Sequence, residues 1–232
     1  MRRVLVTGAN RGLGLEFTQQ LLVRGDHVLG ACRDPERAAE LQALASKYPG
    51  RLDVLRVDMS GDTSVGLLAR TVVGRVEGLD LLVNNAGLNV RGERFGHVDG
   101  DALTACLHTN CIGPFLLAQA LAPLLARGTA AIVANISSQL GSIARTVSFY
   151  TPSYAVSKAA LNMASALLTH GLAPSGVRVV ALHPGWVKTD MGGSSAPLQP
   201  GEAVQGMLQV LDHLGPSESG LFLDYQGHVM PW

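Results

Sequence analysis

The chain has 232 residues, of which 47% are hydrophobic and 16% are charged. A composition so rich in apolar residues excludes an intrinsically disordered protein, because such a chain can bury a large core. The charges of eighteen basic and eighteen acidic residues cancel, so the formal net charge is zero. Without a basic excess, the chain lacks the general surface charge with which proteins bind nucleic acid or anionic membranes.

The cysteine and histidine spacings give no sign of a disulfide scaffold or a metal site. Cys32, Cys106 and Cys111 form no C-x-x-C pair, and no histidines stand as H-x-x-x-H. The apolar run at 4–6 is too short for a signal-peptide core, and no stretch approaches the roughly 18 apolar residues of a membrane span. We therefore predict a cytoplasmic protein with no metal, no nucleic-acid partner and no membrane insertion.

Short β-branched runs alternate with longer helical stretches. This alternation predicts an α/β fold with one Rossmann-type doubly wound parallel sheet of about seven strands, flanked by helices on both faces. We expect strands at 4–7, 26–32, 52–57, 79–83, 130–136, 177–183 and 221–224. We expect helices at 12–24, 35–46, 63–76, 101–126, 154–172 and 202–214. No linker or break in composition divides the series, so residues 1–232 are expected to form one domain.

Two local details of this scheme are specific enough to test. Asp34 is expected to cap the second helix, with Pro35 at its first position. Gly113 and Pro114 interrupt the fourth helix. Pro114 has no N–H for the carbonyl of Asn110, so that carbonyl is free to hold a water leading toward Lys158.

A glycine-rich loop joins the first strand to the first helix. Gly8, Gly12 and Gly14 stand as G-x-x-x-G-x-G. Glycines allow the backbone to approach a pyrophosphate closely, and the helix that follows offers free N–H groups and a positive dipole end. A purely structural turn is the alternative, but three glycines at this position favour a dinucleotide site.

The residue type about 20 positions beyond the loop favours NADP over NAD. An NAD site carries an acidic residue there to bind the ribose 2′-hydroxyl, whereas this chain has Cys32 followed by Arg33. Arg33 suits a 2′-phosphate, and Arg11 in the loop supplies a second cation. A solvated surface arginine is the alternative interpretation of Arg33.

Tyr154 and Lys158 stand four residues apart at the start of a helical stretch, so both side chains lie on one helix face. A cation about 4 Å from a phenol can lower the pKa of the phenol by up to about 3 units, before the desolvation of the lysine is counted. Ser138 follows the fifth strand, where an open α/β sheet places its ligand. The alternatives are chance spacing for the pair and a helix cap for the serine.

Together these motifs resemble the short-chain dehydrogenase/reductase family over essentially the whole chain, in particular NADP-dependent carbonyl reductases of the C-factor and sniffer-like branch. The resemblance rests on the glycine loop, Asp58 after the third strand, Asn84-Asn85-Ala86-Gly87, the Tyr154–Lys158 pair and the segment from Pro184 to Met191. It implies a catalytic tetrad of Asn110, Ser138, Tyr154 and Lys158. Tyr154 would donate the proton, and Lys158 would also bond the ribose hydroxyls.

The resemblance also implies which residues bind the cofactor, NADP(H). Besides Tyr154 and Lys158, these are Gly8, Asn10, Arg11, Gly12, Leu13, Gly14, Arg33, Asp58, Met59, Asn85, Ala86, Gly87, Pro184, Gly185, Val187 and Thr189. A substrate-binding loop is expected at about 186–201. Members often form homodimers or homotetramers through two long helices, here 101–126 and 154–172.

The stretch of 16 positions from Ser138 to Tyr154 is longer than in the shortest family members. Together with Arg145 and Tyr150, Phe149 in this stretch is expected to shape the mouth of the site. Phe149, Trp186 and Trp232 indicate a small-molecule aldehyde, ketone or quinone with apolar bulk, and ordinary packing is the alternative for each. The predicted function is an NADPH-dependent carbonyl reductase. The alternatives are an NADP-binding sensor with little catalysis and an enzyme that oxidises an alcohol.

Overall fold

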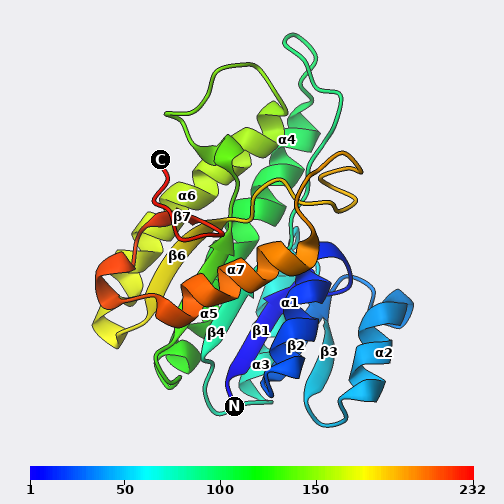
Figure 1. Ribbon diagram of the computed structural model, residues 1–232, viewed down its shortest axis with the longest axis vertical. Coiled ribbons are helices and arrows are strands. Elements are labelled where there is room, and N and C mark those ends of the chain that lie inside the picture. Colours follow the sequence, from blue (N-terminus) through cyan, green and yellow to red (C-terminus); the bar gives the residue numbers. More distant parts are fainter.

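The computed structural model describes residues 1–232 and contains one seven-stranded sheet in the order β3-β2-β1-β4-β5-β6-β7, with every neighbouring pair parallel (Figure 1). The strands are β1 (Arg3–Thr7), β2 (His27–Cys32), β3 (Leu52–Arg56), β4 (Leu81–Asn84), β5 (Ile132–Ile136), β6 (Arg178–His183) and β7 (Phe222–Asp224). The helices are α1 (Gly12–Val23), α2 (Ala39–Lys47), α3 (Asp62–Val73), α4 (Gly100–Leu107), α5 (Gly113–Leu125), α6 (Pro152–Leu172) and α7 (Pro200–His213). The predicted doubly wound α/β sheet is confirmed.

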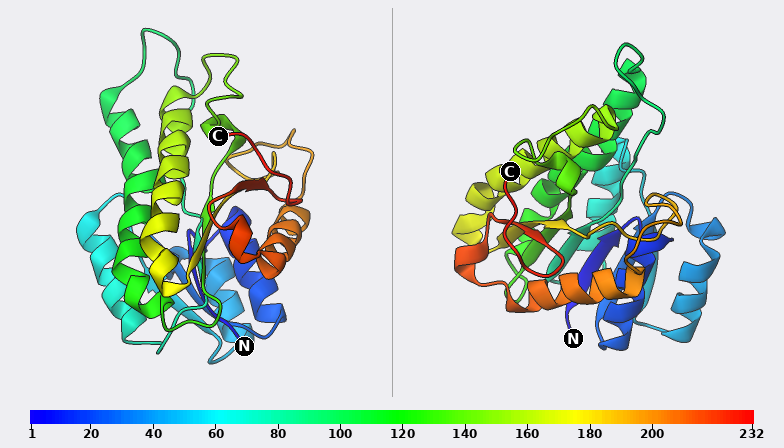
Figure 2. Two further views of the ribbon diagram at one scale, coloured as in Figure 1. Left: turned by 90° about the vertical axis from the view of Figure 1, so that its left-hand side faces the viewer. Right: turned by 45° about the horizontal axis from the view of Figure 1, so that its top comes forward.

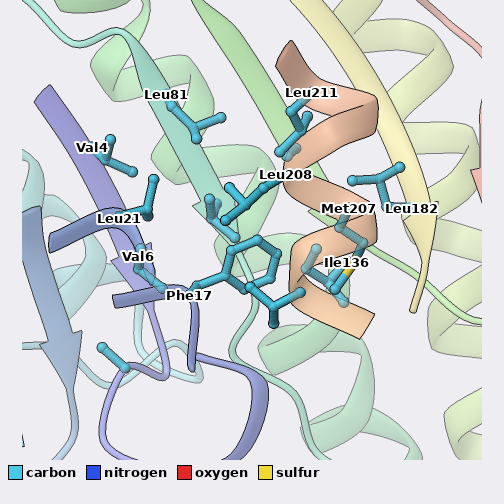
Figure 3. Close-up of a cluster of buried hydrophobic side chains, with 14 of the residues drawn as sticks. Val4, Val6, Phe17, Leu21, Leu81, Ile136, Leu182, Met207, Leu208 and Leu211 are labelled. Carbon is cyan, nitrogen blue, oxygen red and sulfur yellow. The ribbon is translucent and has the colours of Figure 1, made fainter. Parts of the chain in front are cut away.

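Helices cover both faces of the sheet, as the nearly continuous apolar runs of the central strands require. One face carries α1, α2 and α7, and the other carries α3, α5 and α6 with α4 beside them (Figures 1 and 2). A cluster of 27 buried residues fills the first interface, and Figure 3 shows Phe17 of α1 and Met207 of α7 among its side chains. A second cluster of 23 buried residues lies under the other helices. The site is thus built on a sheet that packed helices hold in place on both faces.

The predicted helix at 101–126 is not continuous. Between α4 and α5, residues His108–Ile112 form one π-helical turn, in which the N–H of Gly113 bonds the carbonyl of His108. Such a turn widens a helix and is often found at functional sites. The stretch Gly100–Leu125 is long and apolar enough to cross a membrane by length and composition alone. Seven residues of α5 are buried in this fold, which suits the core helix of a globular domain equally well.

The predicted cap at Asp34 is wrong. Pro35–Arg37 form a short 3-10 turn before α2 begins at Ala39, and the Asp34 side chain makes no capping hydrogen bond. Its carboxylate lies 3.4 Å from the guanidinium of Arg37 instead. A charged partner three residues along the turn competes with the backbone N–H groups for the same oxygens.

Strand order reverses direction between β1 and β4. In open α/β sheets the ligand crevice lies beyond the carboxyl ends of the strands at this switch point. The glycine loop follows β1 and the Asn84–Gly87 segment follows β4, so the topology brings these two motifs to one place.

Candidate active site

A cleft of about 1180 Å³ opens at the carboxyl ends of the strands. Three long loops gather at this end of the molecule, at the top of Figure 1: residues 85–99 after β4, 142–151 before α6 and 184–199 after β6. The cleft runs from the glycine loop to the start of α6. Its size suits a dinucleotide with a small molecule beside it.

The glycine loop is shaped by close approach to the next motif. Gly8 has φ +67°, in the left-handed region. A Cβ on Gly14 would lie 2.1 Å from the Gly8 carbonyl oxygen and 2.5 Å from Nδ2 of Asn85. The amide of Asn85 donates to the Thr7 carbonyl at 2.9 Å, and the Thr7 hydroxyl accepts the N–H of Asn85 at 3.1 Å. Thr7, which the sequence analysis did not single out, therefore fixes the loop against the segment after β4.

The cations predicted for a 2′-phosphate differ in their surroundings. Arg33 is exposed, lines the cleft and has no ion-pair partner. Arg11 also lines the cleft, but its Nη1 bonds the carboxylate of Asp190 at 2.8 Å. Arg33 is thus the cation available to an anion, whereas Arg11 would first have to leave Asp190.

Asp58 lines the cleft near Arg33 and is held in a fixed orientation. Its carboxylate accepts the backbone N–H of Ser60 at 3.0 Å and the Ser60 hydroxyl at 2.7 Å. These hydrogen bonds, with a smaller contribution from the charge of Arg33, hold the pKa of Asp58 below its usual range. An oriented carboxylate at this position can accept hydrogen bonds from a ligand.

The segment after β6 folds on itself and forms the wall of the cleft opposite the β4 loop. Val187 pairs with Leu198, and Nε1 of Trp186 donates to the carbonyl of Gly192 at 2.8 Å. The Thr189 hydroxyl accepts the N–H of Gly192 at 3.1 Å. Trp186 is 54% exposed while it lines the cleft, which leaves its ring accessible to an apolar ligand.

Ser138, Tyr154 and Lys158 meet in the middle of the cleft. Ser138 lies directly after β5, and its hydroxyl accepts the N–H of Leu140 at 3.2 Å. The same hydroxyl lies near the Tyr154 phenol and acts to lower its pKa. The cap that was the alternative for Ser138 therefore exists beside the contact with Tyr154. Nζ of Lys158 lies 5.6 Å from the centre of the Tyr154 ring and donates to the carbonyl of Ile136 at 2.7 Å.

The expected lowering of the Tyr154 pKa is not found. Burial raises the pKa of Tyr154 to about 12 and outweighs the opposite effect of the nearby Ser138 hydroxyl. Burial lowers the pKa of Lys158 to about 8. The expected shift came from the attraction between the lysine cation and the phenolate, before the desolvation of the lysine was counted. In this structure desolvation is the larger effect for both groups. At neutral pH the phenol therefore holds its proton.

Asn110 does not line the cleft. It is fully buried in the π-helical turn, where Oδ1 accepts the N–H of Leu88 at 2.7 Å and Nδ2 donates to the Leu88 carbonyl at 2.8 Å. Nδ2 also donates to the hydroxyl of Ser157 at 2.8 Å, which in turn donates to the Tyr154 carbonyl. The side chain thus joins the loop after β4 to α6 behind the wall of the cleft.

His183 is a cleft residue that the sequence analysis missed. It ends β6 and lines the cleft, and its Nδ1 accepts the N–H of Gln139, next to Ser138, at 3.3 Å. Burial lowers its pKa to about 4, so the ring is neutral at pH 7 with its proton on Nε2. Its place directly before Pro184 was the signal available in the sequence.

Most predicted site residues line this cleft, and four do not. Those that line it are Gly8, Asn10, Arg11, Gly12, Leu13, Arg33, Asp58, Met59, Asn85, Ala86, Gly87, Ser138, Tyr154, Lys158, Pro184, Gly185, Trp186, Val187 and Thr189. Gly14 and Asn110 lie behind its wall. Phe149 meets Phe95 edge to face, with ring centres 5.7 Å apart, and Trp232 stacks on Phe222 at 5.5 Å. The neighbouring Tyr150 lines the cleft, whereas Arg145 does not.

A phosphate-type glycine loop at the switch point of a doubly wound sheet, with a buried Ser–Tyr–Lys cluster beside it, defines a class of nucleotide-dependent oxidoreductases. Residues 2–199 match the family described as short chain dehydrogenase. The chain belongs to the short-chain dehydrogenase family.

Solved structures of carbonyl reductases resemble the chain over its whole length. An NADPH-bound carbonyl reductase from chicken fatty liver is 41% identical with a TM-score of 0.94, and the match covers 100% of this chain and 99% of that one. The carbonyl reductase Sniffer of D. melanogaster is 36% identical, with a TM-score of 0.94 and 100% of both chains covered. C-signal of Myxococcus xanthus is 42% identical over 154 residues, 66% of this chain and 93% of that protein.

Proposed function

We propose that this protein is an NADPH-dependent carbonyl reductase that converts an aldehyde, ketone or quinone to the alcohol or quinol. The buried cluster of Ser138, Tyr154 and Lys158 beside a dinucleotide-shaped cleft carries the proposal. The two solved structures described above are both carbonyl reductases, and one of them is bound to NADPH.

The residues present fit NADPH. The close approach of Gly14 to Gly8 and Asn85 leaves the start of α1 open to a pyrophosphate. The exposed and unpaired Arg33 suits the 2′-phosphate, because a guanidinium binds phosphate with two parallel hydrogen bonds. Pro184, Val187 and Thr189 would lie against the nicotinamide end. When bound there, NADPH supplies the hydride.

The chain itself supplies the proton and orients the carbonyl group. The Ser138 hydroxyl donates a hydrogen bond to the carbonyl oxygen of the substrate, and the Tyr154 phenol gives its proton to the same oxygen as the carbon is reduced. Because burial raises the pKa of Tyr154 to about 12, the phenol is protonated at the start of each turnover. Lys158, whose pKa burial lowers to about 8, takes up a proton readily near neutral pH and returns it to Tyr154.

The substrate end of the cleft favours an apolar molecule. Leu88, Leu140, Tyr150, Trp186 and Met191 line it, and burying such surface drives binding without fixing one substrate. We propose that residues 186–201 form the loop that covers the substrate, within one domain that spans residues 1–232.

The proposal is tested by following NADPH and NADH consumption by the purified protein with quinones, aromatic aldehydes and isatin-like ketones. We expect turnover that is selective for NADPH and is lost in Tyr154→Phe, while the variant still binds NADPH. Folded protein that binds NADPH but reduces no carbonyl compound would refute the proposal and leave the NADP-binding sensor in its place.

We also propose that the protein forms a homodimer or homotetramer through α6 and the neighbouring α4–α5 pair. Val156, Met163 and Leu167 of α6 are 49%, 63% and 56% exposed, and their spacing puts them along one side of the helix. Light scattering on the purified protein tests this, and Met163→Glu should shift the mass toward the monomer.

We place the protein in the cytoplasm. Its three cysteines are free, and two of them are buried. This is the usual state of thiols in a reducing compartment. Fractionation of the source cells tests the placement, and recovery in an oxidising compartment would contradict it.

A further inference from the structure

A short segment in the loop between β4 and α4, residues Arg91–Phe95, is called the strap, and its first two residues line the cleft. Its alternate side chains reach different parts of the molecule. Nη2 of Arg91 donates to the carbonyls of Asp190 and Met191 at 2.8 and 2.9 Å, on the wall formed after β6. Phe95 meets Phe149 in the loop before α6. The strap therefore connects the two sides of the cleft.

The middle residue of the strap, Glu93, reaches the first turn of α6. Its Oε2 accepts the backbone N–H of Ser153 at 3.2 Å, and its Oε1 accepts the Ser153 hydroxyl. Ser153 is fully buried. A carboxylate at this end of a 21-residue helix satisfies one of the N–H groups that the helix leaves unpaired, and it complements the positive end of the helix dipole.

The sequence at the start of α6 provides no cap of its own. The N-cap residue is Thr151, whose φ of +40° is left-handed and whose side chain makes no capping hydrogen bond. Pro152 follows it at the first position of the helix. A helix that starts in this way depends on a partner from elsewhere to hold its first turn, and Glu93, 60 positions earlier, is that partner.

The first turn of α6 is also the turn that carries Tyr154, the residue after Ser153. We propose that Glu93 is a positioning residue, which fixes the first turn of α6 through Ser153 and so holds the Tyr154 phenol against Ser138. Glu93 does not line the cleft, so it acts through the helix and touches neither substrate nor cofactor. The inference rests on the proposed reductase activity for its kinetic consequences, whereas the cap itself is independent of that activity.

The kinetic test compares Glu93→Ala with Glu93→Gln, and Arg94→Ala is the matched control. Arg94 is the exposed neighbour in the same strap and has no side-chain partner. We expect Glu93→Ala to lower kcat about tenfold, equivalent to about 1.4 kcal/mol, with KM and the NADPH Kd within about twofold of the wild type. Glu93→Gln keeps an acceptor for the Ser153 N–H and should retain most of kcat. Arg94→Ala should match the wild type.

A double variant separates action through Ser153 from a general weakening of the strap. If Glu93 acts through Ser153, the kcat of Glu93→Ala/Ser153→Ala falls no further than that of Glu93→Ala, because coupled residues are not additive. Unchanged kcat in Glu93→Ala, an equal loss in Arg94→Ala, or fully additive effects would each overturn the proposal.

Hydrogen exchange provides a readout that needs no turnover. The backbone amides at 153–156 should exchange faster in Glu93→Ala than in the wild type, while those in the middle of α6 keep their protection. Equal exchange at 153–156 would overturn the cap whatever the kinetics show. The opposite outcome is also possible to distinguish. If the wild type shows no reductase activity but Glu93→Ala still speeds exchange at 153–156, the proposed function is refuted and the cap stands.

Discussion

Replacing Asn110 with alanine tests whether this side chain is a structural connection behind the cleft. The substitution removes three hydrogen bonds of 2.7 to 2.8 Å. It leaves the N–H of Leu88 without a partner and the carbonyl of Leu88 with only the weak thiol donor of Cys106, at 3.7 Å. Each buried polar group that loses its partner costs about 1–3 kcal/mol. Leu88 is only half-buried, so water can reach part of it, and the lower half of that range applies.

We therefore expect Asn110→Ala to lower the free energy of unfolding by about 3 kcal/mol. For a domain of this size, such a loss lowers Tm by roughly 6–12 °C. Turnover should fall as well, because the connection from Leu88 to Ser157 positions the helix that carries Tyr154 and Lys158.

Urea unfolding followed by circular dichroism measures the change in stability. Thr104→Ala is the matched control, since Thr104 is exposed on the same helical stretch and makes no side-chain hydrogen bond. A loss below about 0.5 kcal/mol in Asn110→Ala, the usual range for surface substitutions, would refute this reasoning. Only the backbone carbonyl of Asn110, and not its side chain, would then remain as a candidate for a role in the site.

Three further predictions concern the cofactor site and the response to pH. Arg33→Ala should lower kcat/KM with NADPH by roughly 10- to 100-fold, the value of a charge-assisted contact. It should leave kcat/KM with NADH almost unchanged. Steady-state kinetics with both cofactors tests this, and equal losses would contradict it. Gly14→Ala places a Cβ 2.1 Å from the Gly8 carbonyl oxygen and should weaken NADPH binding at least roughly tenfold in a fluorescence titration, whereas Gly66→Ala, with open space around it, should bind normally. Burial lowers the pKa of His183 from 6.5 to about 4. Between pH 6.5 and 4 this residue therefore binds a proton in the unfolded chain but not in the folded chain. Stability should therefore fall as the pH drops from 6.5 to 4, by at most about 3 kcal/mol from this residue. His183→Gln should flatten the fall in urea midpoints measured from pH 4 to 8, and identical slopes would refute the assignment.

The secondary structure follows closely from local patterns because the central strands are buried on both faces. β4 begins two residues later than expected and β1 one residue earlier, but their apolar runs mark their places. The exceptions have physical causes. The Asp34 carboxylate pairs with Arg37 rather than with a helix N–H. The expected helix at 101–126 contains a π-helical turn, whose buried Asn110 bonds residues of other elements.

The glycine loop, the Tyr154–Lys158 pair and Ser138 could be predicted from the sequence, because each depends on spacing along one strand or helix. The tertiary structure alone decided the charge state of Tyr154, since desolvation depends on what packs around the phenol and not on the lysine four residues away. It also decided the role of Glu93, which meets Ser153 across 60 positions of chain. Interactions between residues so far apart in the sequence depend on how the loops pack at the end of the sheet. No local pattern in the chain encodes that packing.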